Sequence, residues 1–442
     1  MGGLVKPAKE PNLKDAFLRF FESEVAGSVV LLGCTIIAMA WANSPWAGLY
    51  QQLINTKIGV SWGEASFSLS VQHWVNDGLM AVFFFVVGLE IKRELLIGHL
   101  SSLKKAILPV TAAAGGMLIP AVIFLFLNAG GEAARGWGVP VATDIAFALG
   151  ILSLLGKRVP ITLKLFLTAL AIADDIGAVL IIALFYTEKI LWTALALAGI
   201  LTFLLHRAVR VRMFSSKTYV VLIIGIWVAV FASGIHATIA GILVALIVPV
   251  RARFEPKEFV VFAREKIREI ESKEMTRESM LLHQDQLESV TELHKATTAL
   301  KPVGISLEHY LHSFQAFLVL PVFALCNAGV ALGSGLRETV MQPVSLGIIL
   351  GLFLGKQIGI TFFSWVIIRT GIADMPEGVT WPQIYGVSCL AGVGFTMSLF
   401  VSDLAFKTAS LIDDAKIGIL AASLISGIAG YLFLRRVLPR SA

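Results

Sequence analysis

Four ionisable residues lie near the middle of apolar runs that are each long enough to cross a bilayer: Asp144 in residues 137–155, Asp174 and Asp175 in residues 159–187, and Lys356 in residues 343–368. An ionisable side chain at the centre of a spanning helix costs about 2.5–3.5 kcal/mol on insertion scales. Because exposing these side chains to hydrocarbon is costly, they are expected to face one shared polar cavity at mid-depth. A small cation or a proton is the natural occupant of such a cavity.

The adjacent aspartates Asp174 and Asp175 point about 100° apart on a helix, so they cannot share one face. One can face the cavity while the other meets a partner on a neighbouring helix, and Lys356 is the expected partner. The simpler alternative is a structural ion pair with a spare acid, but one lysine cannot neutralise three aspartates. Desolvation and like-charge repulsion therefore favour the protonated form of at least one acid. A carboxylate that titrates near cellular pH can exchange its proton for Na⁺ or Li⁺, and access alternating between the two sides would make this exchange antiport.

The composition predicts an all-α, polytopic membrane protein. The chain is 57% hydrophobic and 15% charged, with a mean hydropathy of +0.81, which lies far outside the range of soluble globular domains. A spanning helix needs about 20 mostly apolar residues, and on this basis about twelve spans begin near residues 26, 71, 105, 139, 160, 190, 217, 235, 308, 343, 382 and 412.

The distribution of Lys and Arg predicts that both termini are cytoplasmic, because basic residues favour the cytoplasmic side. With twelve crossings, one side holds Lys6, Lys9, Lys14, Arg19, Lys92, Arg93, Lys104, Lys105, Lys157, Arg158, Arg207, Arg210, Arg212, Lys217, Arg435, Arg436 and Arg440. The opposite side shows only scattered basic residues such as Lys57, Arg135, Lys189 and Arg337. The formal charge of +6 reflects this bias and gives no indication of nucleic-acid binding.

Four regions follow from this topology. Residues 1–25 form an N-terminal segment whose amphipathic residues 13–21 either lie on the membrane surface or form an ordinary flanking turn. Residues 26–250 hold the first eight spans, and residues 307–442 hold the last four and a short tail. Residues 251–306, rich in both charges, are predicted as one or two cytoplasmic helices. The cysteines Cys34, Cys326 and Cys389 form no CxxC pair, so no metal site or other cofactor is predicted.

Two spans carry features of interrupted helices. Pro140, Thr143 and Asp144 break the apolar character of the fourth span, and Gly392 and Gly394 lower the helix propensity of the eleventh. Irregular backbone at membrane depth is tolerated where it lines a cavity or is buried in protein. Interrupted helices at corresponding positions of two halves indicate a binding site between inverted repeats. For the late glycines alone, close helix packing is the alternative.

At these residues the chain resembles the NhaA-type sodium/proton antiporters. The likeness runs from Phe20 to the last span and includes Ala42–Pro45, His73–Leu95, Ala142–Phe147, Ala173–Ala178, Gly234–Gly241, Asn327–Val330, Gly355–Lys356 and Gly392–Met397. So many matches in order are specific, whereas any one alone would be weak. Since this family is itself an example of the inverted-repeat pattern, its agreement with that pattern is not independent.

The resemblance implies a twelve-helix fold in the bacterial inner membrane, with the fourth and eleventh spans unwound and crossing at mid-membrane. It implies that Asp175 is the principal cation and proton site and that Asp174 exchanges contact with Lys356 during the cycle. Thr143 and Asp144 would lie at the crossing, with Asp144 compensating the helix-end dipoles.

Family members are electrogenic and are activated at alkaline pH, and the resemblance assigns this activation to ionisable residues at the cytoplasmic funnel. The matching positions are Glu90, Glu94, Glu308 and His309, with His236 as a further candidate. Each has a plainer interpretation. The glutamates could anchor a helix end, and His236 could hydrogen-bond within a turn.

Three rival functions would also place ionisable residues at membrane depth. An intramembrane aspartyl protease would need a Gly-x-Gly-Asp motif, which is absent, so no enzyme is predicted. A proton-coupled symporter of a small organic solute is the closer rival, although three acids against one lysine disfavour an anion site. A passive channel would not require proton-exchanging carboxylates. The family resemblance also implies a homodimer. Residues 61–70 could form either an extracellular hairpin that serves the contact between subunits or a plain loop.

Overall fold

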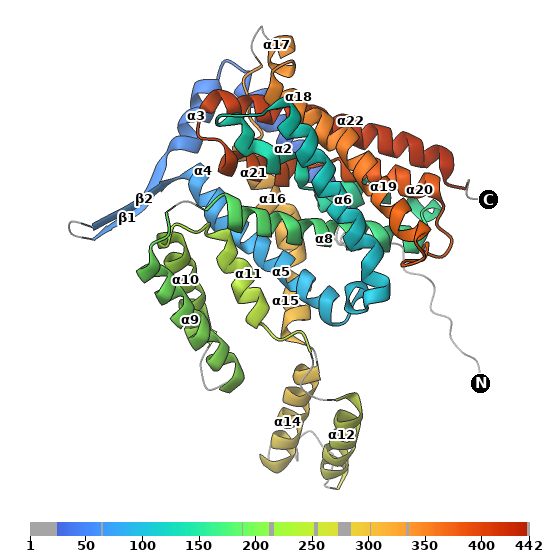
Figure 1. Cartoon of the computed structure of the whole chain (residues 1–442). Helices are drawn as coiled ribbons and strands as arrows, with labels where there is room; N and C mark the ends of the chain where they lie inside the picture. Colours follow the sequence, from blue (N-terminus) through green and yellow to red (C-terminus); the bar gives the residue numbers. More distant parts are fainter. Residues whose placement is uncertain are drawn as a thin grey trace.

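The computed structural model describes residues 24–62, 65–187, 189–211, 216–251, 255–272, 284–300, 302–332 and 336–439. Its helices pack into one bundle, from which a two-stranded hairpin and a pair of helices project (Figure 1). The N-terminal segment predicted for residues 1–25, including the amphipathic residues 13–21, lies outside the described residues except for Glu24 and Val25.

The elements up to residue 247 are mostly apolar helices. In chain order they are α2 (Glu24–Ala42), α3 (Ala47–Asn55), β1 (Lys57–Trp62), β2 (Ala65–Ser70), α4 (Val71–His73), η1 (Trp74–Leu79), α5 (Met80–Leu96), η2 (His99–Ser101), α6 (Leu103–Leu127), η3 (Ala133–Val141), α7 (Ile145–Ser153), η4 (Gly156–Arg158), α8 (Ile161–Phe185), α9 (Trp192–Val211), α10 (Ser216–Ala232) and α11 (Thr238–Ile247).

The remaining elements begin with a charged pair of helices and continue with apolar ones. They are α12 (Pro256–Glu271), α14 (Gln284–Leu300), α15 (Val303–Phe314), η5 (Gln315–Val319), α16 (Leu320–Asn327), α17 (Leu336–Val340), α18 (Pro343–Leu350), η6 (Gly351–Gly355), α19 (Lys356–Arg369), α20 (Trp381–Ala391), α21 (Phe395–Ala405) and α22 (Ala409–Val437). The segments η1, η5 and η6 are π-helical turns within longer helices.

The predicted membrane spans are confirmed. Among the described residues, nine helices are long and apolar enough to cross a membrane, and the bent pair α20 and α21 makes a tenth span. The shorter apolar helices Lys217–Ala232 and Thr238–Ile247 occupy the positions predicted for the seventh and eighth spans. The nine to ten spans found among the described residues make the chain an all-α, polytopic membrane protein, and the full count of twelve stays a prediction.

Two spans are interrupted, as the sequence predicts. In the fourth, the 3₁₀ segment η3 ends at Val141 and α7 begins at Ile145, with extended backbone between them. In the eleventh, α20 and α21 are bent by 46° at the break that follows Ala391. Residues 103–185 and 343–437 share one order, a long helix, an interrupted helix and a second long helix, which is the arrangement expected of two repeats.

Glycines bring α6 and α19 into backbone contact beside Lys356. A Cβ atom placed on Gly359 would lie 2.1 Å from the main-chain oxygen of Gly115, and one on Gly115 would lie 2.5 Å from the oxygen of Gly359. No side chain larger than hydrogen fits at this crossing, so small residues set the helix separation. The close contact fixes the helix that carries the buried lysine.

The strands β1 (Lys57–Trp62) and β2 (Ala65–Ser70) pair antiparallel, which confirms the hairpin interpretation of residues 61–70 and extends it to Lys57. The register pairs Lys57 with Ser70 and Trp62 with Ala65. The hairpin projects from the bundle beside α3 and α4 (Figure 1). It adds a small sheet to an otherwise helical protein, and Trp74 Nε1 in η1 donates a hydrogen bond of 2.9 Å to the main-chain oxygen of Ile58 in β1.

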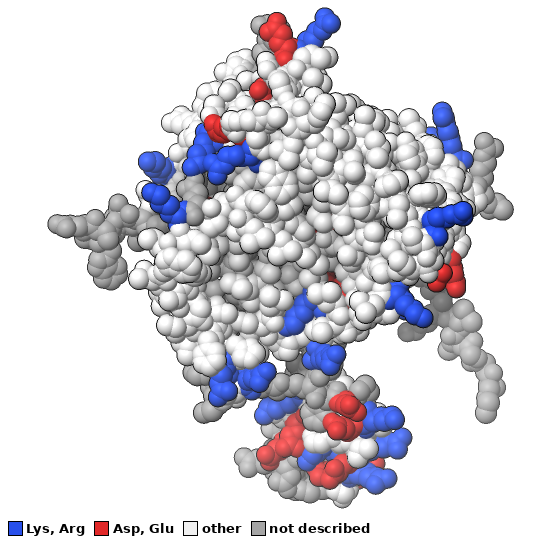
Figure 2. Space-filling model, viewed as in Figure 1, with Lys and Arg blue, Asp and Glu red and all other residues white. Residues whose placement is uncertain are grey.

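In the described part of the charged connection between the eighth and ninth spans, two helices, α12 and α14, pack on each other apart from the bundle (Figure 1). Lys266 Nζ lies 3.0 Å from Glu269 Oε2 and 2.8 Å from Glu292 Oε2. The hydrogen bonds from Lys266 and Ser289 hold the pKa of Glu269 below its usual range. Charged side chains crowd this pair, whereas the bundle surface is largely uncharged in this view (Figure 2).

We expect Gly359→Ala to lower the melting temperature of the detergent-solubilised protein, because its methyl group must push α6 and α19 apart. Overpacking of this kind costs about 1–3 kcal/mol. Gly199→Ala on α9 is the matched control, since no atom lies within 4 Å of its added Cβ and alanine favours a helix by about 1 kcal/mol over glycine. Equal melting temperatures for the two variants would contradict the close crossing.

Candidate functional site

Asp144 caps two helices at the crossing of the interrupted spans. Its Oδ1 accepts a hydrogen bond of 3.1 Å from the main-chain N–H of Phe147, in the first turn of α7. Its Oδ2 accepts from the N–H of Thr396, at 3.0 Å, and from the Thr396 hydroxyl, at 2.5 Å, in the first turn of α21. Helix N-termini carry partial positive charge and unpaired N–H groups. One carboxylate therefore serves the positive ends of both inner half-helices.

The chain breaks themselves are joined by main-chain groups. The N–H of Asp144 donates to the oxygen of Val393 at 2.7 Å, and the hydroxyl of Ser398 donates to the oxygen of Val139 at 2.8 Å. These bonds satisfy backbone groups that the breaks leave without helical partners. The crossing is consequently a hydrogen-bonded joint between residues 139–144 and 391–398.

Gly392 and Gly394 are required at this joint by close approach. Both have negative φ, so no left-handed backbone is involved. A Cβ on Gly392 would lie 2.5 Å from the oxygen of Leu352, and one on Gly394 would lie 2.9 Å from the oxygen of Ala142. The helix break and the approach of three chain segments thus depend on the same two glycines.

Thr143 links this joint to the aspartate pair. Its hydroxyl lies 2.5 Å from Asp174 Oδ2 and 2.9 Å from the main-chain oxygen of Ala391. A hydroxyl has one hydrogen to donate, so it can serve only one of these acceptors at a time. The contact of Thr143 with Asp174 is therefore one that can be exchanged without moving the backbone.

Asp174 and Lys356 form the buried ion pair expected from the sequence. Asp174 Oδ2 contacts Lys356 Nζ, and the lysine is completely buried. The π-helical turn η6 ends directly before Lys356, and such turns often occur at functional sites. Asp174 Oδ1 is buried and has no hydrogen-bond partner among the residues that the structure describes. An oxygen in this condition is an acceptor for a cation or for a proton.

Asp175 is only 4% exposed and lies next to Asp174 on α8. The charges that act on its carboxyl group are those of Asp174, Glu90, Asp144 and Lys356. The acids in this set outnumber the lysine, so the site attracts a cation and repels an anion. The structure therefore brings together all four ionisable residues singled out in the sequence, together with Thr143.

The pH-sensing candidates divide into three groups. Glu94 and Glu308 share Arg93, whose guanidinium nitrogens lie 3.3 Å and 3.0 Å from their carboxylates. Glu90 lies on the same helix and lines a pocket of about 70 Å³ that also contacts Ile145 and Ala146, the residues that follow Asp144.

Of the two histidines, His309 directly follows Glu308 on α15, whereas His236 lies elsewhere. His309 is exposed, and its ring lies 6.0 Å from that of Tyr310. His236 bonds through Nε2 to the main-chain oxygen of Tyr186 at 2.8 Å, directly after α8 ends. Alternating spans place the end of α8 opposite the Arg93 end of α5. His236 therefore does not join the glutamates.

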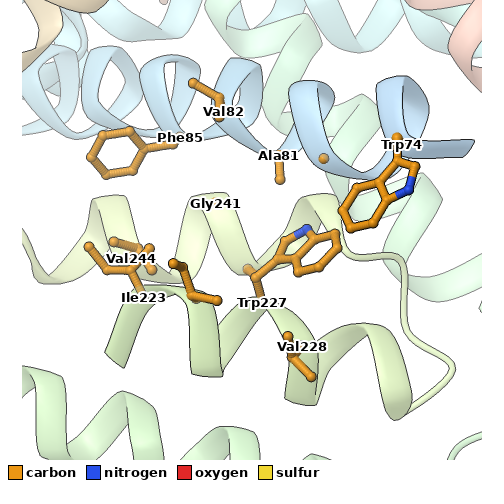
Figure 3. A pocket seen from close by; sticks show the side chains of 12 residues that line it. Trp74, Ala81, Val82, Phe85, Ile223, Trp227, Val228, Gly241 and Val244 are labelled. Atoms are coloured by element: carbon orange, nitrogen blue, oxygen red, sulfur yellow. The ribbon is translucent and has the colours of Figure 1, made fainter. Parts of the chain in front are cut away.

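An apolar pocket of about 510 Å³ lies between α5, α10 and α11 and is separate from the carboxylates (Figure 3). The rings of Trp74 and Trp227 stack at 5.9 Å at one end of it. All residues that line it are apolar or glycine. Without a polar ligand it cannot hold a bare cation, and its chemistry is that of the hydrocarbon around the bundle.

Sequence reasoning missed two sets of polar residues. Thr396, the second partner of Asp144, gave no signal because a single threonine is common in apolar helices. Asp403 and Lys416 lie inside the predicted eleventh and twelfth spans, so the criterion that selected Asp174 and Lys356 could have found them. The structure places Asp403 in a cluster with Asn76 and Asn327.

A multi-pass bundle in which two interrupted helices cross beside buried carboxylates defines the class of secondary active transporters. The model of the family described as Na⁺/H⁺ antiporter 1 matches residues 18–434, and the chain belongs to this family. It is 45% identical to the Na⁺/H⁺ antiporter NhaA of Oleidesulfovibrio alaskensis, with 98% of this chain and 96% of that protein covered. It is 46% identical to the NhaA of Bordetella parapertussis, with 98% of each chain covered.

We expect Asp144→Ala to destabilise the protein by about 2–4 kcal/mol, because it removes two caps and leaves buried donors on Thr396 unpaired. Thermal unfolding of the solubilised protein measures this effect. Asp413→Ala is the matched control, since Asp413 is exposed on α22. A loss no larger than that of the control would show that the carboxylate does not join the two half-helices.

Proposed function

We propose that this chain exchanges cytoplasmic Na⁺ for external H⁺ across the bacterial inner membrane. The single observation that carries the proposal is the excess of buried acids over lysine at the crossing, with one oxygen of Asp174 left unpaired. Family membership supports it, since the similar proteins are named Na⁺/H⁺ antiporters. Li⁺ is a second substrate, because the same oxygen ligands suit both small hard cations.

In this mechanism Asp175 is the principal site and Asp174 is its partner. When both acids are ionised, carboxylate oxygens of Asp175 and Asp174 bind the cation. Lys356 and Thr143 then give up their contacts with Asp174. When protons arrive they neutralise the carboxylates, and the cation loses its ligands. Asp144 remains tied to both helix N-termini, where its negative charge also offsets the dipoles that would repel the cation.

The coupling is competition for one set of oxygens. Two protonatable carboxylates serving one monovalent ion make the exchange electrogenic, with the proton gradient driving cation export. The rival symport of a small organic solute finds no support, because the site is acidic and the similar proteins are named antiporters. The chain is a transporter, and no enzymatic step is assigned to it.

The proposed topology has both termini in the cytoplasm. It assigns residues 26–250 to eight spans, residues 251–306 to a cytoplasmic connection, and residues 307–442 to four spans and a tail. The basic residues that precede and follow the spans support this orientation. The charge pairs between α12 and α14 support an aqueous location for the connection.

The glutamates around Arg93 are proposed as the pH sensor, because Glu90 lines the pocket that reaches the residues after Asp144. The strands β1 and β2 are proposed as a homodimer contact, because they project from the bundle (Figure 1). The mass of the solubilised protein with and without this hairpin tests the contact.

We expect Asp175→Asn to abolish the Na⁺- and Li⁺-dependent collapse of an imposed pH gradient in vesicles. The amide keeps the size of the side chain but cannot ionise, so it can neither carry a proton nor balance a cation. Asp413→Asn, a change of the same kind on an exposed residue, should behave as the parent. Full sodium-driven proton movement in Asp175→Asn would overturn the assignment.

We expect Lys356→Met to lower stability by about 3–5 kcal/mol, the cost of leaving one partner of a buried pair alone. Adding Asp174→Asn should restore most of this loss, because the second charge is then gone as well. Thermal unfolding of the single and double variants measures both effects, with Lys104→Met on exposed Lys104 as control. A double variant less stable than Lys356→Met would contradict the pairing.

A further inference from the structure

A second polar cluster, partly buried, joins the spans at the end of the bundle that carries the β1–β2 hairpin. Asn76 Nδ2 lies 2.9 Å from Asp403 Oδ2, and Asn327 Nδ2 lies 2.8 Å from Asn76 Oδ1. Gln72 Nε2 lies 3.0 Å from Asn327 Oδ1. These residues come from α4, η1, α16 and α21, so one network of side chains ties together the second, ninth and eleventh spans.

The network closes this end of the bundle to water. Asn327 is fully buried, and Asn76 lies in the π-helical turn η1, where the regular helix is already interrupted. Polar side chains in an apolar bundle keep one another satisfied, and opening the cluster requires water to replace these bonds. Lys416, only 7% exposed, and His73 are the charged and titratable groups that face Asp403.

Helix α21 connects this cluster to the cation site. Thr396, near its start, holds Asp144, and Asp403 lies seven residues further along. Seven residues are almost two turns, so both side chains leave the same face of the helix about 10 Å apart along its axis. A movement of α21 at the crossing is therefore transmitted directly to the contact with Asn76.

The other end of the bundle differs. There a pocket of about 70 Å³ reaches Ile145 and Ala146 beside the crossing. Between the crossing and Asp403 lies Ser398, which is completely buried and bonded to the oxygen of Val139. The structure thus has a recess next to the site on one side and a hydrogen-bonded cluster on the other.

We propose that Asn76, Asn327 and Asp403 form the outer gate of the transporter, in which Asp403 is a positioning residue that holds α21 against the second and ninth spans. The gate is closed in this structure and opens by release of Asp403 from Asn76 when the site faces outward. The inference rests on the proposed function for its direction, since the outer end is defined by the proposed topology.

The test is the accessibility of a buried cysteine from outside the cell. In full-length protein with Cys34, Cys326 and Cys389 replaced by alanine, Ser398→Cys supplies a thiol behind the gate. A membrane-impermeant maleimide added to intact cells should label it slowly. Adding Asp403→Ala or Asn327→Ala should accelerate labelling by about fivefold, because loss of a net hydrogen bond shifts the closed–open equilibrium by this order.

Ser402→Ala is the matched control, because Ser402 neighbours Asp403, is fully buried, and bonds only to the oxygen of Leu399 in its own helix. Its labelling rate should equal that of Ser398→Cys alone. Equal rates in the Asp403 and Asn327 variants, or an equal increase in the Ser402 control, would overturn the gate.

A second measurement does not depend on how well the alanine variants fold. With Asn76→Cys and Asp403→Cys, a short reducible bifunctional thiol reagent should stop exchange in vesicles, and reductant should restore it. Continued exchange by the cross-linked protein would refute the gate. The labelling assay involves no sodium transport, so failure of Na⁺/H⁺ exchange and failure of the gate are distinguishable.

Discussion

Two broken helices within hydrocarbon leave four helix ends whose N–H and C=O groups have no water to bind, and the whole arrangement depends on satisfying them. Regular helices avoid this cost because they satisfy their backbone internally. Here the carboxylate of Asp144 takes the N–H groups of α7 and α21, while main-chain and hydroxyl donors take the oxygens of Val393 and Ala391. The backbone is thereby held open beside the ion site at a tolerable energy.

This joint also determines what the neighbouring charges can do. Asp144 is committed to helix ends and is a poor candidate for exchange, whereas Asp174 has one paired and one unpaired oxygen. Asp175 adds a further carboxyl group without a lysine of its own. The proposed division of the three acids into one structural and two exchangeable groups rests on their hydrogen bonds and not on their residue type.

Close packing supplies the rigidity that such a site needs. The backbone contact of α6 with α19 fixes the base of Lys356, and the glycines of the eleventh span admit the chain of the fourth. Against these fixed parts, α21 contacts the ion site at Thr396 and the outer cluster at Asp403. A short half-helix with a polar contact at each end is suited to relay a change at one end to the other.

The sequence by itself determined the class of fold and the identity of the charged core. Apolar runs of spanning length, buried Asp and Lys, and turns between runs are local properties, because hydrocarbon imposes the same demand on each segment. They were sufficient to predict most of the spans, the two interruptions and a pairing of Lys356 with one of the two adjacent aspartates. Residues 61–70 stayed open between a hairpin and a plain loop, and the choice of Asp174 came from the family resemblance. The tertiary structure decided which partners meet across the bundle. The capping of α21 by Asp144, the distance of His236 from the glutamates, and the cluster of Asn76, Asn327 and Asp403 all join residues far apart in the chain. No local pattern encodes these contacts, because they depend on how the helices cross.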